Sequence, residues 1–198
     1  MTTILLSATS KRYTPAEYLE LEEQAEYKSE YRDGEIISMA GATANHNEIS
    51  GNVYSNFKFG LKGQDYRVYV SDMRLWIPSR RQYTYPDVLL VQGEPIFTDK
   101  NTTTVTNARL VVEVLSKSTK NYDRGDKFDH YRSIPELQEY ILIDQSCYHL
   151  MQYVKTDEKQ WLLTDYTQVE DTLKFGSIDF SLTMSDIYDR VNFADIEE

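Results

Sequence analysis

The chain has 198 residues, of which 40% are hydrophobic and 27% charged, a composition typical of a soluble globular protein. Its single cysteine, Cys147, excludes an internal disulfide framework, and its apolar runs are too short to cross a membrane. The net charge of -11 argues against a polyanionic partner, but residues 36–155 are nearly neutral, with 14 basic and 13 acidic groups. We therefore expect one cytoplasmic domain over 1–198, with its core at about 45–145 and no targeting signal.

Local signals define the elements of the first third of the chain. Thr14-Pro15 favours a helix that begins there and ends at about Gln24. Asp33-Gly34, between two short β-type segments, predicts a hairpin. Residues 45–62 place apolar side chains at helical spacing, and Gly63 closes that helix.

The remainder of the chain alternates strands and short helices. Asp123 is expected to cap a helix over 123–133, which Pro135 ends. Strands are expected at 66–70, 74–77, 85–91, 109–115, 138–144, 148–154, 160–166 and 172–175, and a last short helix from about 185. This order predicts an α/β (α+β) fold: a mixed central sheet with a helix on each side, extended by residues 146–198.

Glu113 is the most unusual residue of the sequence, because it lies within Leu110–Leu115, a run that is apolar on both faces. A carboxylate buried alone is unfavourable, so proteins pair it, protonate it or place it on a metal. The alternatives here are a strand end near the surface or a salt bridge to a buried arginine such as Arg74 or Arg109. The strand by itself leaves these alternatives open.

Asp87 begins a second apolar strand, Pro86–Val91. If this strand and 109–115 are antiparallel neighbours, Asp87 and Glu113 converge. Two carboxylates at close range repel each other, and a divalent cation relieves the repulsion. Hard oxygen ligands favour Mg²⁺ or Mn²⁺, and the three scattered histidines give no zinc spacing.

Lys127 follows the second of these strands after a polar loop. Residues 117–132 carry 5 basic against 3 acidic groups, the most positive window of the core. A lysine beside a phosphodiester can stabilise the transition state or orient the attacking water. The alternative is a solvated helix face on which Asp123 and Lys127 form an i,i+4 ion pair.

Four segments in order carry a resemblance to a known family: Tyr85-Pro86-Asp87, Glu113-Val114-Leu115-Ser116, Asp123-xxx-Lys127 and Glu139–Asp144. Together they resemble the Uma-type family of endonucleases, in the PD-(D/E)xK restriction-endonuclease-like superfamily, over roughly residues 13–145. The resemblance implies a mixed sheet flanked by helices and a Mg²⁺-dependent site that hydrolyses phosphodiester bonds. It implies Asp87 as the first acid of the motif and Glu113 as the second.

The sequence departs from the superfamily pattern two residues after Glu113, where Leu115 stands in place of the lysine. The resemblance implies that this lysine has moved to the following helix, as Lys127. Secondary candidates are polar or acidic residues of the surrounding elements: His46, Glu48, Asp72 and Asp123.

The expected function is a Mg²⁺- or Mn²⁺-dependent endonuclease that acts on nucleic acid, DNA in the first place, with Asp87 and Glu113 on the metal and Lys127 at the phosphate. A catalytically inactive nuclease fold that binds or regulates is the alternative, favoured by Leu115 and the excess of acids. A structural protein is a third hypothesis. A homodimer is also expected, because one compact domain would grip little of a duplex.

Overall fold

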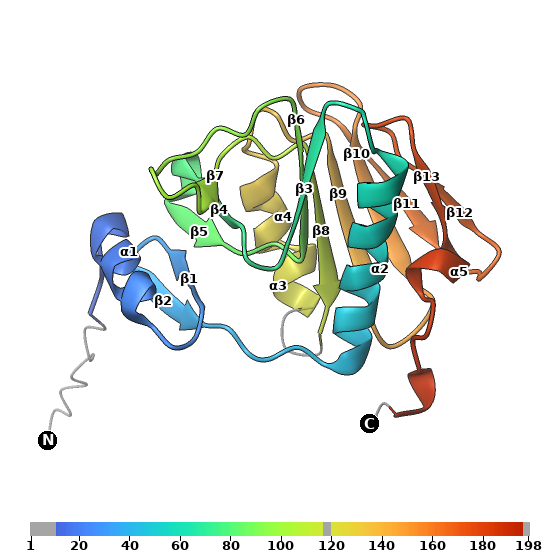
Figure 1. The fold of residues 1–198 in the computed structure, drawn as a ribbon, viewed down its shortest axis with the longest axis horizontal. Helices are drawn as coiled ribbons and strands as arrows, with labels where there is room; N and C mark the ends of the chain where they lie inside the picture. Colours follow the sequence, from blue (N-terminus) through green and yellow to red (C-terminus); the bar gives the residue numbers. More distant parts are fainter. Residues whose placement is uncertain (1–10, 117–119, 196–198) are drawn as a thin grey trace, which may run out of the picture.

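The structure, a computed structural model, describes residues 11–116 and 120–195. A six-stranded mixed sheet in the order β11-β10-β9-β8-β6-β3 runs through its centre (Figure 1). β8 and β9 are parallel, and the other neighbours in this sheet are antiparallel. The strands are β3 (Tyr66–Val70), β6 (Val88–Gln92), β8 (Leu110–Leu115), β9 (Glu139–Asp144), β10 (Leu150–Lys155) and β11 (Trp161–Tyr166).

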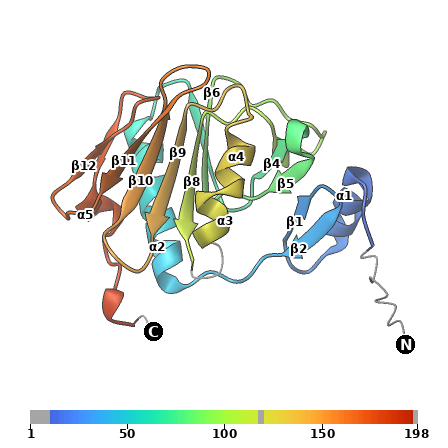
Figure 2. The ribbon, with the colours of Figure 1, turned by 180° about the vertical axis from the view of Figure 1, so that it is seen from behind.

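Helices cover both faces of this sheet. The long helix α2 (Ala44–Gly60) lies on one face in Figure 1. Two short helices, α3 (Lys120–Arg124) and α4 (Asp126–Tyr131), lie on the other face, seen from behind in Figure 2. They form the crossover that two parallel strands such as β8 and β9 require.

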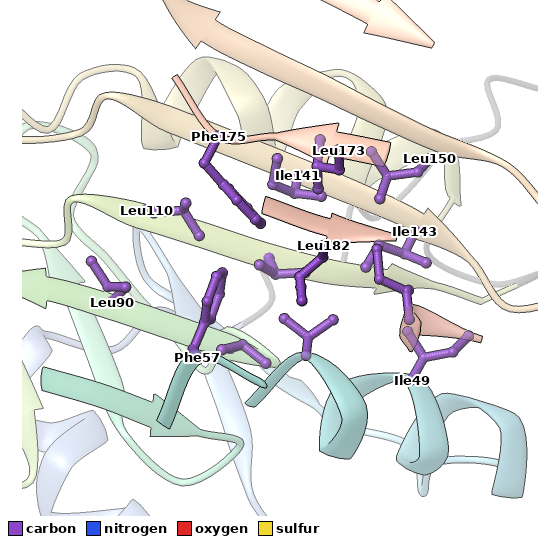
Figure 3. Packing of buried hydrophobic residues seen from close by; sticks show 14 of the residues in the cluster. Ile49, Phe57, Leu90, Leu110, Ile141, Ile143, Leu150, Leu173, Phe175 and Leu182 are labelled. Carbon is purple, nitrogen blue, oxygen red and sulfur yellow. The ribbon is translucent and has the colours of Figure 1, made fainter. Parts of the chain in front are cut away.

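β8 separates two apolar clusters, because its side chains alternate between the faces of the sheet. Leu110, Val112 and Val114 face α2, while Val111 and Leu115 face the α4 side. Figure 3 shows the α2 side, where residues from the helix, the sheet and the C-terminal segment interdigitate. Its labelled members are Ile49, Phe57, Leu90, Leu110, Ile141, Ile143, Leu150, Leu173, Phe175 and Leu182.

A second sheet, in the order β2-β1-β5-β4-β7, joins the N-terminal segment to the rest of the molecule. Its strands are β1 (Ser29–Arg32), β2 (Glu35–Ser38), β4 (Arg74–Ile77), β5 (Gln82–Thr84) and β7 (Thr104–Val105). The helix α1 (Pro15–Gln24) begins with a capping box between Thr14 and Glu17. Stacked rings of Tyr18, Tyr31 and Tyr83 pack α1 and β1 against β5.

The C-terminal segment packs on the α2 side of the central sheet. β12 (Thr172–Lys174) and β13 (Ser181–Thr183) form a two-stranded sheet, and α5 (Met184–Ile187) follows. Leu173, Leu182 and Met184 enter the same apolar cluster as α2. Two 3-10 turns complete the described elements, at Pro78–Arg80 and Phe193–Asp195.

Most elements confirm the sequence-based expectations. The mixed sheet flanked by helices is present, α1 ends at Gln24, and β6 and β8 are antiparallel neighbours. Asp33 and Gly34 form the hairpin turn with φ of 41° and 105°.

Across the described ranges 11–116 and 120–195, we find no helix with the length and apolar character needed to span a bilayer.

Four details differ from those expectations. The helix expected over 45–62, with Gly63 closing it, ends at Gly60 and has Leu61 as its C-cap residue. The helix expected over 123–133 is two helices, since Gly125 (φ -114°, ψ -95°) leaves the helical conformation; Asp123 therefore lies within α3 and does not cap the second helix. The strand expected over 85–91 begins at Val88, and Asp87 precedes it. The second sheet was not expected, because its strands are short and far apart in the sequence.

Candidate active site

Asp87 stands directly before β6, where the ladder between β6 and β8 ends at the pair Val88 and Val112. Continuing this register by one residue sets Asp87 opposite Glu113, and directly opposite residues of antiparallel strands have neighbouring side chains. The Asp87 Oδ2 atom accepts a hydrogen bond of 2.7 Å from the Val114 amide. The main chain of β8 therefore fixes the Asp87 carboxylate beside Glu113.

Glu113 points to the α4 side of the sheet and is 4% exposed. Its Oε1 atom accepts a hydrogen bond of 2.5 Å from the Tyr131 hydroxyl and lies 2.8 Å from Lys127 Nζ. Burial raises the pKa of Glu113 to about 8, against the opposing effect of Lys127; the nearby Asp87 and Asp123 also raise it. Asp87 and Glu113 are thus close enough to repel each other.

Lys127 lies on α4 at the centre of an acidic cluster. Its Nζ atom is 2.8 Å from Glu113, 3.5 Å from Asp123 and 3.6 Å from Glu30. Burial opposes the charged form, but these three acids together raise the pKa of Lys127 well above its usual value. The side chain is therefore an ammonium ion. The i,i+4 pair with Asp123 that the sequence suggested is present, but on a buried face.

Glu30 is the member of this cluster that the sequence did not single out. It lies on β1, is 5% exposed, and accepts hydrogen bonds from Arg32 and from the Thr84 hydroxyl. Burial opposes ionisation, but Lys127, Thr84 and Arg32 together lower the pKa of Glu30 below its usual value. The signal in the sequence is an acid next to a tyrosine in a short hairpin strand, which is too common to be specific.

His46 joins the site from the first turn of α2, where Thr43 caps the helix by accepting from the His46 amide. Its Nε2 atom lies 3.1 Å from Asp87 Oδ2. The other two secondary candidates lie apart: Glu48 is exposed on α2, and the Asp72 carboxylate is 86% exposed and paired with Lys28 at 2.6 Å.

The arginines considered as partners of Glu113 are engaged elsewhere. Arg74 donates to the hydroxyl groups of Thr103 and Thr104, and Arg109 donates to the carbonyl of Ser177. The cation beside Glu113 is Lys127. The hypothesis that one of these two arginines neutralises Glu113 is therefore wrong.

The donor set fits a hard divalent cation better than zinc. Within 11–116 and 120–195, no group of three or more His, Cys, Asp or Glu residues is arranged to hold a metal ion. Mg²⁺ does not require such a cage, since it commonly binds one or two carboxylates and keeps several waters. The neighbouring carboxylates of Asp87 and Glu113 fit this requirement.

The fold is that of the restriction-endonuclease-like nucleases. A crystal structure from Anabaena variabilis, described as a "putative nuclease belonging to DUF820", matches with a TM-score of 0.74, covering 89% of this chain and 97% of that chain at 19% identity. This similarity concerns the fold alone.

Sequence comparison identifies the family. The model of Uma2, described as "Putative restriction endonuclease", matches residues 15–185. The uncharacterized protein sll1609 of Synechocystis sp. is 49% identical, covering 87% of this chain and 98% of that protein. A second Synechocystis protein, slr1290, also uncharacterized, is 40% identical, with 92% and 94% covered. The chain therefore belongs to the Uma2 family, which confirms the family resemblance inferred from the sequence.

Proposed function

We propose that this protein is a metal-dependent endonuclease that hydrolyses phosphodiester bonds of nucleic acid, with DNA as the first substrate to test. Asp87 and Glu113 would hold Mg²⁺ or Mn²⁺. The observation that carries the proposal is the 2.8 Å ion pair between Lys127 and Glu113, since it supplies an ammonium ion beside the acid whose own strand has Leu115 in the lysine position.

Each side chain of the site then has a distinct role. When bound, a divalent cation neutralises phosphate charge and lowers the pKa of water, which provides a nucleophile at neutral pH. Lys127 stabilises the negative charge that develops on the phosphate in the transition state. The Val114 amide and His46 orient the Asp87 carboxylate, and the Tyr131 hydroxyl orients Glu113.

The test is metal-dependent cleavage of supercoiled plasmid. We expect the wild type to nick the plasmid with Mg²⁺ or Mn²⁺, and Asp87→Ala and Glu113→Ala to lose this activity and to bind Mn²⁺ more weakly in calorimetry. Asp72→Asn serves as the control with an exposed acid. Failure to cleave DNA or RNA with either ion would overturn the proposal.

The same experiment distinguishes an active endonuclease from the alternative, which is a catalytically inactive nuclease fold with a binding or regulatory role. Leu115 and the net charge of -11 favour that alternative. An inactive site should bind Mn²⁺ weakly in the wild type as well.

We further infer that the protein acts in the cytoplasm as a homodimer, because two copies would contact more of a duplex than one. Sedimentation would test the oligomeric state.

A further inference from the structure

We propose that Glu30 is a positioning residue for Lys127, so that the N-terminal segment of residues 11–38 completes the active site. This inference rests on the proposed function, because it concerns the ammonium ion assigned to the phosphate. It assigns a role to a residue outside the motifs of the resemblance and outside the two metal-binding carboxylates.

The Glu30 carboxylate is fixed independently of Lys127. Its Oε2 atom accepts hydrogen bonds from Arg32 at 2.5 and 3.2 Å, and its Oε1 atom accepts one from the Thr84 hydroxyl. Thr84 belongs to β5, which pairs with β1. The carboxylate is therefore held from two strands and can serve as a fixed point.

Lys127 needs such a fixed point. A lysine side chain has a flexible four-carbon stem, so an isolated ammonium ion is poorly defined in position. Glu113 is shared with the proposed metal, and Asp123 comes from the short helix directly before α4. Glu30 is the acid that approaches Lys127 from a different sheet, at 3.6 Å. It therefore constrains the ammonium ion from a direction that the other two acids do not supply.

Arg32 connects this contact to the rest of the N-terminal segment. Glu30 and Arg32 lie on the same face of β1, two residues apart. The Arg32 guanidinium lies 3.6 Å from the centre of the Tyr122 ring on α3, and Gln82 of β5 donates to the Tyr122 hydroxyl at 3.1 Å. One face of β1 is thus in contact with both helices that carry the acidic cluster.

The decisive variant is Glu30→Gln, which keeps the shape of the side chain and removes its charge. We expect kcat to fall about 10- to 100-fold, the range expected for a misplaced group, with KM and Mn²⁺ affinity unchanged. Glu30→Asp, which keeps the charge, should recover part of this loss. A residue that only stabilises the fold would not produce this separation of kcat from KM.

Glu22→Gln is the matched control. Glu22 is a partly buried acid of the same N-terminal segment, and it binds Ser29 and Tyr85. Its loss should lower the melting temperature while kcat of the folded enzyme stays within about threefold, since it leaves the cluster intact. If Glu30→Gln does not fold, Thr84→Val replaces it, because this change removes one donor to Glu30 and should give a smaller fall in kcat.

A second readout does not depend on nuclease activity. The rate at which an amine-modifying reagent labels Lys127, followed by mass spectrometry, should rise in Glu30→Gln and remain at the wild-type value in Glu22→Gln. Equal kcat and equal labelling in Glu30→Gln and wild type would overturn the inference while the proposed function stands. If the wild type cleaves nothing, the proposed function fails, and unchanged labelling in Glu30→Gln would then reject the contact as well.

Discussion

Two buried glutamates on neighbouring strands, Glu113 on β8 and Glu139 on β9, have opposite surroundings. Both lie in apolar strands, and burial raises the pKa of both. In the parallel register Glu139 pairs with Leu110 at the first position of the strand pair, and Glu113 pairs with Leu142 three positions further along.

The difference lies in their partners. Glu139 accepts hydrogen bonds from neutral donors: Gln152 Nε2 at 2.6 Å and the Ser177 hydroxyl and amide at 2.6 and 3.0 Å. Glu113 instead has an ammonium ion on one side and further acids nearby. Neutral donors satisfy the buried Glu139 carboxyl group, whereas Glu113 shares one cation, Lys127, with two other acids. Burial of an acid therefore does not identify a functional site by itself.

The largest expected effect comes from removing the ammonium ion of Lys127, which pairs with Glu113. Lys127→Met leaves three buried acids without their ammonium ion, and we expect a loss of about 3–5 kcal/mol in the free energy of unfolding. Cleavage by the folded fraction should fall on the order of 10²- to 10³-fold. Urea unfolding and single-turnover cleavage measure the two effects.

Lys58→Met, at an exposed position of α2, is the control for the loss of a lysine. It should change the free energy of unfolding by about 0.5 kcal/mol or less. A Lys127→Met protein as stable as the wild type would show that the acidic cluster does not depend on this cation.

The next effect concerns Glu139. In Glu139→Gln the side-chain amide faces groups that are themselves donors, so we expect a loss of about 1–3 kcal/mol in the free energy of unfolding. Cleavage by the folded protein should remain at the wild-type rate, because Glu139 lies at the far end of the strand pair. A loss of turnover at unchanged stability would contradict the distinction between Glu139 as a structural acid and Glu113 as an acid of the proposed site.

The pH dependence of the same variant sharpens this prediction. Burial raises the pKa of Glu139 above 4.5, so the folded state holds this proton more tightly than the unfolded chain. The resulting stabilisation is fully present below pH 4.5 and is lost as the pH rises through the folded-state pKa. The stability of the wild type relative to Glu139→Gln should therefore decrease with rising pH above 4.5, which urea unfolding at several pH values measures.

The smallest effect is expected at Asp72, an acid that the sequence suggested as a secondary candidate. Its carboxylate is 86% exposed and pairs with the partly exposed Lys28. Asp72→Asn should change the free energy of unfolding by about 1 kcal/mol at most. Plasmid cleavage should stay within about twofold of the wild type. A strong loss of cleavage would show that Asp72 takes part in the site although it lies outside the acidic cluster.

The sequence predicted those parts of the site that depend on local pattern. Leu110–Leu115 and the strand after Asp87 are apolar runs that the sequence shows directly. Their antiparallel pairing is a condition that the sequence leaves open, and the structure shows it. The positive window 117–132 indicates Lys127 as a candidate, but the helix pattern alone also fits a solvated face, and the family resemblance favours the site. The structure places this lysine 2.8 Å from Glu113.

Glu30 could not be predicted in the same way, because its burial arises from packing between distant segments. Ser29–Arg32 has the pattern of an exposed hairpin strand, and two pairs with β5, Tyr31 with Tyr83 and Arg32 with Gln82, bring it into the second sheet. Such short non-local pairings leave no periodicity in the sequence. The break at Gly125 was missed for a related reason: a single glycine inside a helical pattern is often tolerated.

The contact between Glu30 and Lys127 also has a consequence for how the chain folds. The two residues are separated by roughly a hundred positions, and the conformational entropy lost on closing a loop grows with its length. On the ribosome, Glu30 emerges well before α4 exists. The acidic cluster is therefore a long-range assembly, and contacts of this kind tend to slow folding. We expect the surroundings of Lys127 to be completed after the local hairpins and helices have formed.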